Sequence, residues 1–271
     1  MTPLSGKTRA EVWLNAVRVL HDSKSRLYNL ILEVNEPELT TSASRAIEKL
    51  VDAFLRDHNC QPLHTVAETI FPAAEYRQGG LAAVYAYPET VFPFIKAANP
   101  WGTYALRMNT PRVDKKGQLI NPLEALIEKL RHQLSLTSTK RAVYELSLMS
   151  ETLDLTTYEV ESDHTDVIGG QCLSHLSFKL GPNRELYLTG LYRYQWFMQK
   201  ALGNLLGLAR LQSCVARELN IPVGPLVCHA TLGILEGPGV MKTPWKTREI
   251  TNLIADCERV RDSVTPEEAA A

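Results

Sequence analysis

Residues 172–209 read CLSHLSFKLGPNRELYLTGLYRYQWFMQKALGNLLGLA, and this stretch decides the fold. It contains two strand-like segments at 172–180 and 185–197, which a Gly-Pro-Asn turn signal at 181–183 joins. The next segment, 199–220, is strongly helical, and its apolar residues fill more than one stripe of the helix surface. The sequence therefore predicts an antiparallel hairpin followed by a helix that is buried on most sides.

Two glycines, Gly203 and Gly207, lie four residues apart within this helix. Each weakens a helix by about 1 kcal/mol relative to alanine. We therefore expect another part of the chain to approach the helix backbone closely at these positions.

The rest of the chain mixes helices and strands. Apolar residues at helical spacing predict three further helices, at 10–21, 42–58 and 123–134. Short or alternating apolar runs predict three further strands, at 27–34, 141–148 and 223–235. Ser42 or Ser44 is expected to cap the second of these helices, and the acidic stretch 150–166 is expected to be a surface excursion. Because no repeat or linker is present, we expect one domain over residues 1–271, with a frayed tail at about 263–271.

The composition excludes several classes of protein. The 271 residues are 45% hydrophobic and 22% charged, which is typical of a globular protein. The chain has 29 lysine and arginine residues and 30 acidic residues. It therefore lacks the overall positive charge that would indicate non-specific binding of nucleic acid. No run approaches the ~18 apolar residues of a membrane span, and the N-terminus lacks the apolar core of a secretory signal. The five cysteines are scattered without a CxxC pair, so we expect a reduced, cytoplasmic protein without a disulfide framework.

Common catalytic and metal-binding motifs are absent from the sequence. It has no Walker A loop and no GxGxxG, GxSxG or HExxH motif, and no histidine lies at metal-ligand spacing with a cysteine. We therefore expect no metal site. What remains is cofactor-free thiol chemistry, or no chemistry.

Cys172 is the main candidate nucleophile. It follows two glycines and begins a strand, where a thiol can stand at the lip of a cleft. A thiol reacts as the thiolate, so a cation would have to lower its pKa from ~8.5, and the candidates are Lys140, Arg141 and Arg193. The alternative, which is more common at strand starts, is a small buried hydrophobic residue.

Two upstream segments could add an acid and a ligand-binding wall. Glu68 lies amid apolar residues in TVAETIFP (65–72), and burial there would raise its pKa and let it exchange protons near neutrality. On the residues alone, a glutamate on a helix surface is favoured. WGTYALR (101–107) combines Tyr104 and Arg107, which suit a planar ligand and an anion, or else are a core aromatic beside a solvated arginine.

Taken in order, these segments resemble the thymidylate synthase and pyrimidine hydroxymethylase superfamily. That family has a strand reading roughly CHxxFQF, a strand ending in YQRSxD, and a helix that opens with LG and an asparagine. The corresponding stretches here are CLSHLSF (172–178), YQWFMQ (194–199) and LGNLLGLA (202–209). GTYALR (102–107) and TKRAVYE (139–145) resemble the family's glycine-tyrosine-arginine segment and its paired arginines, and the resemblance covers about two thirds of the chain.

The resemblance implies an α/β (α+β) fold of three layers, with a central mixed sheet, a long buried helix and a homodimer formed by sheets packed back to back. It also implies a reduced folate, 5,10-methylenetetrahydrofolate, as the one-carbon donor. By position, Cys172 would be the nucleophile that adds to C6 of a pyrimidine, Glu68 the proton relay and Tyr104 a helper near C5. Arg141, with Lys140, would contact the nucleotide phosphate from the partner subunit.

Several positions depart from the family pattern. Trp196 and Phe197 replace the family's arginine and serine, and Gln199 replaces the aspartate associated with the folate ring. Gly207 replaces the asparagine that reads the pyrimidine edge, and Asn204, one turn earlier, is the candidate substitute.

Arg193 could replace the lost arginine only if the strand is bulged, because three residues are an odd step on a period-two strand. The substrate-binding candidates are Arg107, Lys140, Arg141, Arg193, Gln195, Trp196, Gln199 and Asn204.

Each charged hydrogen bond lost to these changes is worth ~1.5–3 kcal/mol, so a housekeeping thymidylate synthase is not expected. We expect a transferase that modifies C5 of a pyrimidine nucleotide by methyl or hydroxymethyl transfer. The alternatives are a catalytically inactive, dimeric nucleotide-binding or scaffold protein of the same fold, and different chemistry in the same pocket, such as base release.

Overall fold

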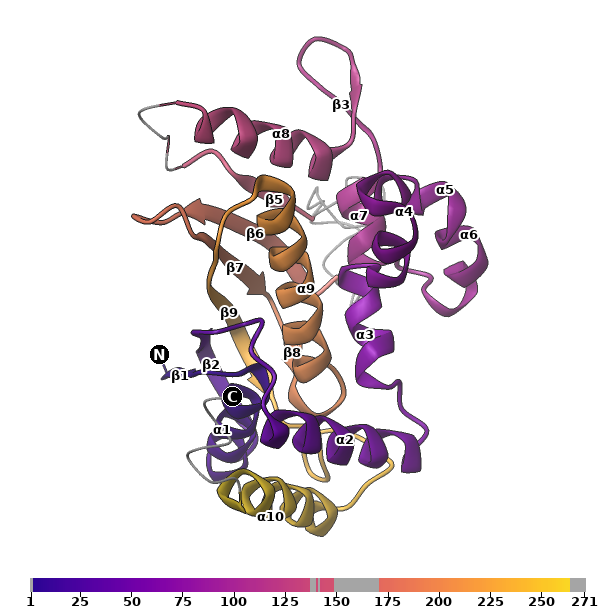
Figure 1. The fold of residues 1–271 in the computed structure, drawn as a ribbon. Helices are drawn as coiled ribbons and strands as arrows, with labels where there is room; N and C mark the ends of the chain where they lie inside the picture. Colours follow the sequence, from indigo (N-terminus) through magenta and orange to yellow (C-terminus); the bar gives the residue numbers. More distant parts are fainter. Residues whose placement is uncertain (1, 137–139, 141, 149–170, 264–271) are drawn as a thin grey trace, which may run out of the picture.

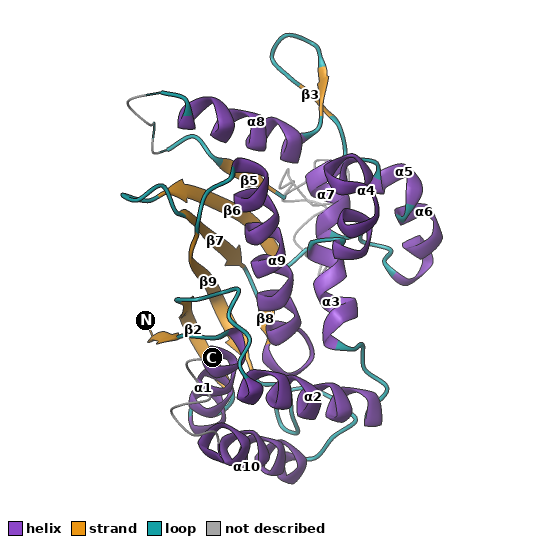
Figure 2. Ribbon diagram, viewed as in Figure 1, coloured by secondary structure: helices purple, strands orange, loops and turns teal. Residues whose placement is uncertain are grey.

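The computed structural model describes residues 2–136, 140, 142–148 and 171–263, which form a sheet flanked by helices (Figures 1 and 2). The strands are β1 (Thr2–Gly6), β2 (Arg26–Val34), β5 (Glu145–Ser147), β6 (Leu173–Leu180), β7 (Leu186–Tyr192), β8 (Gln195–Trp196) and β9 (Val223–Ile234). Within the described residues these make a seven-stranded sheet in the order β1-β2-β9-β7-β6-β5, with β8 paired to β9. Parallel and antiparallel pairs are combined, so the central mixed sheet expected from the sequence is confirmed.

Helices cover one face of this sheet. Helix α1 (Arg9–Asp22) packs against β2, and α9 (Leu202–Leu219) packs against β7 and β9 (Figure 1). Burial alternates along β7, where Leu188 and Tyr192 are buried while Tyr187 and Leu191 are half-exposed. This period-two pattern places the core on the helix side and leaves the opposite face partly open.

The other helices form two groups. Helices α2 (Ser42–Asp57) and α10 (Thr247–Ser263) pack on each other and on α1. A second group lies beside α9 and consists of α3 (Leu63–Ile70), α4 (Ala73–Tyr85), α5 (Tyr87–Thr90), α6 (Phe92–Ile95) and α7 (Tyr104–Asn109) (Figure 1). Helix α8 (Pro122–Leu134) flanks β5, and β3 (Arg112–Val113) pairs with β4 (Leu119–Ile120) in a projecting hairpin.

The long helix α9 is buried along most of its length, as predicted. Helix α3 lies directly against its two glycines. A Cβ atom at Gly207 would lie 2.8 Å from the carbonyl oxygen of Ala67, and one at Gly203 would lie 2.6 Å from Cβ of Val66. The predicted close approach to the α9 backbone is therefore confirmed, and α3 is the segment that makes it.

Most of the predicted elements are present, and the exceptions have local causes. The Gly-Pro-Asn hairpin joins β6 and β7 in antiparallel register, as predicted. Thr41 caps α2 instead of Ser42 or Ser44, because its hydroxyl accepts the hydrogen bond of the Ser44 amide (3.1 Å). The predicted strand 141–148 is only the three residues of β5, and residue 141 lies outside the described residues.

The strand predicted at 185–197 is wrong in its second half. It breaks after Tyr192, resumes for the two residues of β8, and at Phe197 enters one π-helical turn, Phe197–Ala201, that leads into α9. Helices α3 to α7 and α10 have no counterpart in the prediction. The stretch 150–166 and the tail at 264–271 lie outside the described residues. None of the described helices is long and apolar enough to cross a membrane.

The contact between α3 and α9 generates a prediction about Gly207. We expect Gly207→Ala to lower the free energy of unfolding by about 1–3 kcal/mol, because the added methyl group overlaps the Ala67 carbonyl and must push the helices apart. Alanine should otherwise stabilise the helix by about 1 kcal/mol. Urea unfolding followed by circular dichroism measures the change. Ser213→Ala on the same helix is the control, and a Gly207→Ala protein of raised stability would contradict the prediction.

Candidate active site

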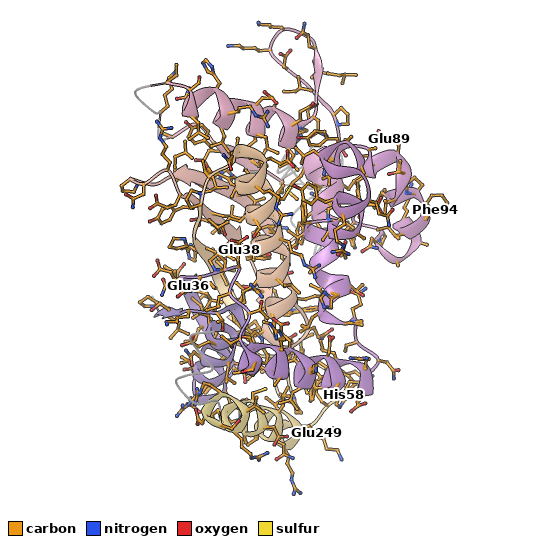
Figure 3. The ribbon with its side chains drawn as sticks, in the orientation of Figure 1. Glu36, Glu38, His58, Glu89, Phe94 and Glu249 are labelled. Atoms are coloured by element: carbon orange, nitrogen blue, oxygen red, sulfur yellow. The ribbon has the colours of Figure 1, made fainter. Side chains whose placement is uncertain are left out.

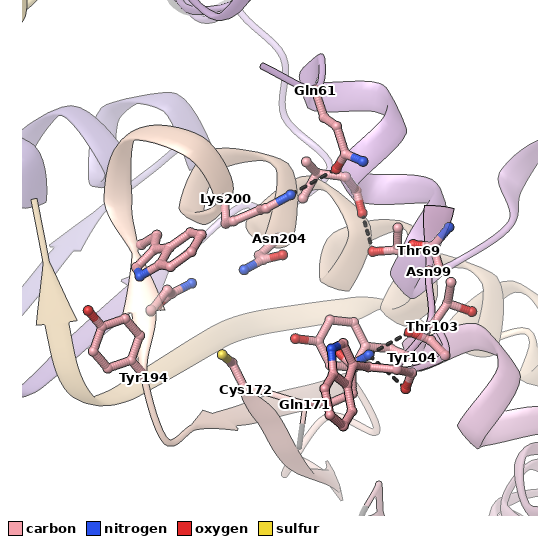
Figure 4. Close-up of a pocket in the computed structure, with 15 residues that line it drawn as sticks. Gln61, Thr69, Asn99, Thr103, Tyr104, Gln171, Cys172, Tyr194, Lys200 and Asn204 are labelled. Carbon is pink, nitrogen blue, oxygen red and sulfur yellow. Dashed lines mark hydrogen bonds between the residues drawn. The ribbon is translucent and has the colours of Figure 1, made fainter. Parts of the chain in front are cut away.

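A cavity of about 370 Å³ lies where α3, α7, the start of α9 and the segments around Cys172 and β8 meet (Figure 4). Aromatic rings and side-chain amides make up most of its wall. The lining residues are Gln61, Val66, Thr69, Asn99, Trp101, Gly102, Thr103, Tyr104, Gln171, Cys172, Tyr194, Gln195, Trp196, Lys200 and Asn204. Aromatic faces and amide groups together suit a planar ligand with hydrogen-bonding edges.

Cys172 lies on the wall of this cavity, directly before β6. Its carbonyl oxygen accepts a hydrogen bond from the Arg193 amide (2.8 Å), which holds the segment against the end of β7. Burial raises the pKa of the thiol, while the positive charges of Arg193 and Lys200 lower it. Burial is the larger effect, so the thiol form dominates at neutral pH and the two cations are what favours the thiolate.

Tyr104 stands at the first turn of α7, across the cavity from Lys200 (Figure 4). Its hydroxyl oxygen accepts a hydrogen bond from the Leu173 amide (3.2 Å), and its ring meets Tyr192 edge to face. Burial raises the pKa of Tyr104, so the hydroxyl keeps its proton and can donate it in a hydrogen bond.

Two lining amides have hydrogen-bonding capacity to spare. Gln195 is 2% exposed, and its Oε1 accepts from the Cys228 thiol (3.4 Å), while its Nε2 has no partner within the described chain. Asn204 is 5% exposed and lines the same cavity from α9. A buried amide donor without a partner costs free energy, so a ligand carbonyl that accepts from Gln195 would be favoured.

Among the described residues that line the cavity, Lys200 is the one with a positively charged side chain. Its ammonium group donates to Oε1 of Gln61 (2.8 Å), and burial lowers its pKa while Cys60, Glu236 and Cys172 raise it.

Glu236 is a fully buried carboxylate beside the π-helical turn. It accepts hydrogen bonds from the amides of Met198 (2.8 Å) and Gln199 (3.0 Å), and so anchors the turn that carries Lys200. Burial raises the pKa of Glu236 to about 7, while the hydrogen bonds from these amides lower it.

The structure brings five of the sequence candidates together on this cavity: Cys172, Tyr104, Gln195, Trp196 and Asn204. Trp196 adds an aromatic wall, and its buried Nε1 has no partner within the described residues.

Glu68 is not among the residues that line the Cys172 cavity. Its side chain is 36% exposed and forms an ion pair with Arg210 (3.0 Å), so the structure does not bury this carboxylate. The alternative, a glutamate on a helix surface, fits its position on α3. Glu68 lines a neighbouring cavity of about 380 Å³.

Three further candidates also point elsewhere. Arg107 is buried, and its guanidinium donates to the carbonyl oxygens of Leu148 (2.9 Å) and Trp101 (2.9 Å), which fixes the α7 segment. The backbone N–H of Gln199 donates to Glu236, and Gln199 is not among the residues that line the cavity. Arg193 is exposed and donates to the carbonyl oxygen of Gln171 (3.0 Å), so it acts on Cys172 by its charge and not as part of the lining.

Of the two residues expected to bind the phosphate, Lys140 and Arg141, the structure describes only Lys140. Lys140 is exposed, its amide donates to Gln133 (2.9 Å), and its side chain does not line the cavity. Arg141 lies outside the described residues. No group of three metal-ligating side chains is present in the described part of the chain.

Sequence reasoning missed Lys200 and Glu236. Lys200 lies between two of the stretches compared with the family, YQWFMQ (194–199) and LGNLLGLA (202–209). Glu236 is a single acidic residue in the glycine-rich stretch GILEGPG (233–239). The apolar and glycine neighbours of Glu236 were the one feature of the sequence that could have indicated a buried carboxylate.

Comparison with known proteins bears on the fold. No family model and no curated protein matches the sequence. Among solved structures, the chain is similar to the thermostable thymidylate synthase A from Bacillus subtilis, with a TM-score of 0.51 at 12% sequence identity. The match covers 93% of this chain and 84% of that chain. The thymidylate synthase-like fold expected from the sequence is therefore confirmed, and at this identity the similarity shows the fold alone.

Glu236 generates a prediction about pH. Its folded-state pKa of about 7 exceeds that of an unfolded glutamate, ~4.3, so the unfolded chain ionises first as pH rises. We therefore expect stability to fall between about pH 4.5 and 7, and Glu236→Gln to remove about 3 kcal/mol of that fall. Urea titrations across this pH range measure it. Glu89→Gln, an exposed site labelled in Figure 3, is the control, and an equal effect there would contradict the prediction.

Proposed function

We propose that this protein modifies C5 of a pyrimidine nucleotide, or of a derivative, by methyl or hydroxymethyl transfer, with Cys172 as the nucleophile. The observation that carries the proposal is the convergence of Cys172, Tyr104, Gln195 and Asn204 on one cavity. The thymidylate synthase-like fold supports it by analogy of fold alone.

The proposed reaction begins with addition of the Cys172 thiolate to C6 of the ring. The S–C6 bond forms, the C5=C6 double bond opens, and the electron pair moves to C5 and the neighbouring carbonyl oxygen. C5 then bonds to the one-carbon unit and gives up its proton, and the bond between that carbon and a nitrogen of its donor breaks. The transferred carbon is at the formaldehyde level, so addition of water would give the hydroxymethyl product, whereas hydride from the reduced folate, which would leave as a dihydrofolate, would give the methyl product. Breaking the S–C6 bond finally restores the double bond and releases the thiolate, so the covalent addition divides one difficult substitution into easier steps.

The lining side chains support the charge changes of these steps. The Gln195 Nε2 and the Asn204 amide are donors for the oxygen on which negative charge develops. Lys200 and Arg193 favour the thiolate that starts the reaction. Tyr104, which keeps its proton, supplies a hydrogen-bond donor on the same wall.

We assign the reduced folate to the neighbouring cavity, which shares Gln61, Thr69 and Asn99 with the Cys172 cavity. Phe94 and Ile95 offer apolar contact to a planar ring, and Glu68 and Glu75 are acceptors for ring N–H groups. Bound there, the folate would supply the one-carbon unit.

We also propose a homodimer in which the partly open face of the sheet meets its copy. The half-exposed side chains of β7 and β9 on this face, such as Leu191 and Val227, favour such packing. Lys140 and Arg141, which the family resemblance implies are phosphate contacts from the partner subunit, would then complete the site.

The proposed function predicts a covalent adduct. After incubation with 5-fluorouracil and 5-fluorocytosine nucleotides and methylenetetrahydrofolate, intact-protein mass spectrometry should show one bound nucleotide together with one folate, and peptide mapping should place the adduct on Cys172. Once C5 has bonded to the one-carbon unit, fluorine cannot leave C5 as a cation, so the adduct should accumulate. Cys172→Ala should abolish it.

Cys60→Ala is the matched control, because Cys60 is also half-buried but does not line the cavity, and this variant should form the adduct. Tight binding of these nucleotides without any adduct would favour the inactive binding or scaffold protein instead. The absence of both adduct and binding across uracil and cytosine nucleotides would refute both.

A further inference from the structure

A second cavity, about 360 Å³ in volume, lies on the other side of the α3–α9 contact from Cys172. Lys200 of the π-helical turn and Asn204 of α9 line the first cavity, whereas Leu206 and Arg210 of α9 line the second. At 3.6 residues per turn, these positions place the two pairs on different sides of the helix. The second cavity is therefore separate from the candidate active site.

Arginine side chains from three helices converge on the second cavity. They are Arg9 of α1, Arg77 of α4, and Arg210 and Arg217 of α9. Within the described lining the one carboxylate is Glu38, labelled in Figure 3, which comes from the segment after β2. Glu48 (3.8 Å from Arg9) and Glu68 (3.0 Å from Arg210) pair with two of the arginines from outside the lining, so the excess of positive charge that faces this cavity is carried by Arg77 and Arg217.

The guanidinium group of Arg210 is close enough to those of Arg9 and Arg77 for their charges to repel. Burial lowers the pKa of Arg210, Glu68 raises it, and the charge of Arg77 lowers it again. Burial also lowers the pKa of Arg9, with Glu48 opposing this effect and Arg210 adding to it. A bound anion would relieve this repulsion between like charges.

Two of the arginines are held in place by the protein. Arg9, whose side chain is 6% exposed, donates to the carbonyl oxygen of Pro37 and to Thr40 Oγ1 (3.0 Å). Arg210 is fixed by its ion pair with Glu68. Side chains that are already ordered lose little entropy when a ligand binds, so these two form a preorganised wall.

The guanidinium groups of Arg77 and Arg217 are available to bind a ligand. The side chains of Arg77 and Arg217 are exposed and make no hydrogen bond or ion pair with the part of the chain that the structure describes. A guanidinium group presents parallel N–H donors that match two oxygens of a phosphoryl group. Phe71 and Tyr76, with ring centres 5.7 Å apart, supply an aromatic wall for an organic substituent.

We propose that this arginine cavity binds a small phosphorylated compound, with Arg77 and Arg217 contacting the phosphoryl group in front of Arg9 and Arg210. The cavity volume is within the range of small-molecule sites. The net charge of −1 and the confinement of these arginines to one cavity favour a small ligand over a nucleic acid, which is bound through an extended basic surface.

Titration calorimetry with pyrophosphate and with inorganic phosphate, at constant ionic strength, tests this proposal. We expect the full-length protein to bind pyrophosphate, and the double variant R77Q/R217Q to bind it at least about tenfold more weakly, because two charge-assisted contacts are lost. Both residues are exposed, so the variant should fold normally, which circular dichroism checks.

Arg248→Gln is the matched control, since Arg248 is an exposed arginine on α10 that does not line the cavity, and its affinity for pyrophosphate should equal that of the unchanged protein. Equal binding by all three proteins, or no pyrophosphate binding by the unchanged protein, would overturn the proposal. Arginine-dependent binding of a single-stranded oligonucleotide or an acidic peptide in place of pyrophosphate would overturn its assignment to a small ligand.

Discussion

The close approach of α3 to the backbone of α9 determines where both cavities form. Gly203 and Gly207 lack the Cβ atoms that would keep α3 away, so Val66 and Ala67 lie against the α9 backbone. This contact divides the surface of α9. On one side of the contact, Lys200 and Asn204 face the Cys172 cavity, and on the other side Leu206, Arg210 and Arg217 face the arginine cavity. Neither cavity would keep its walls if the two helices moved apart.

Burial of the Cys172 cavity favours one part of the proposed reaction and opposes another. It excludes water from the cavity, which strengthens hydrogen bonds from donors such as Gln195, but it also raises the pKa of the Cys172 thiol. The protein offsets this penalty with two cations, Arg193 beside the thiol segment and Lys200 on the π-helical turn. Glu236 holds that turn through its backbone amides. A buried acid outside the cavity therefore positions a cation inside it.

The sequence predicted the hairpin and the long helix because local chemistry specifies them: a Gly-Pro-Asn turn and an uninterrupted helical pattern. The two glycines even indicated a close helix contact, although not its partner. The site was predicted only in part. Cys172 and Asn204 face one cavity, but Arg107 and Gln199 point elsewhere, because side-chain direction depends on breaks such as the one after Tyr192 and on tertiary partners that a linear pattern does not contain.

The central claim is that a thiolate on Cys172 adds to C6 of a bound pyrimidine. Addition makes C5 basic, so hydrogen at C5 should exchange with water even without a one-carbon donor. The most direct measurement is the release of tritium from pyrimidine nucleotides labelled at C5. The account predicts release that requires Cys172 and is lost in Cys172→Ala. No release above the Cys172→Ala level, from any uracil or cytosine nucleotide that binds, would contradict it.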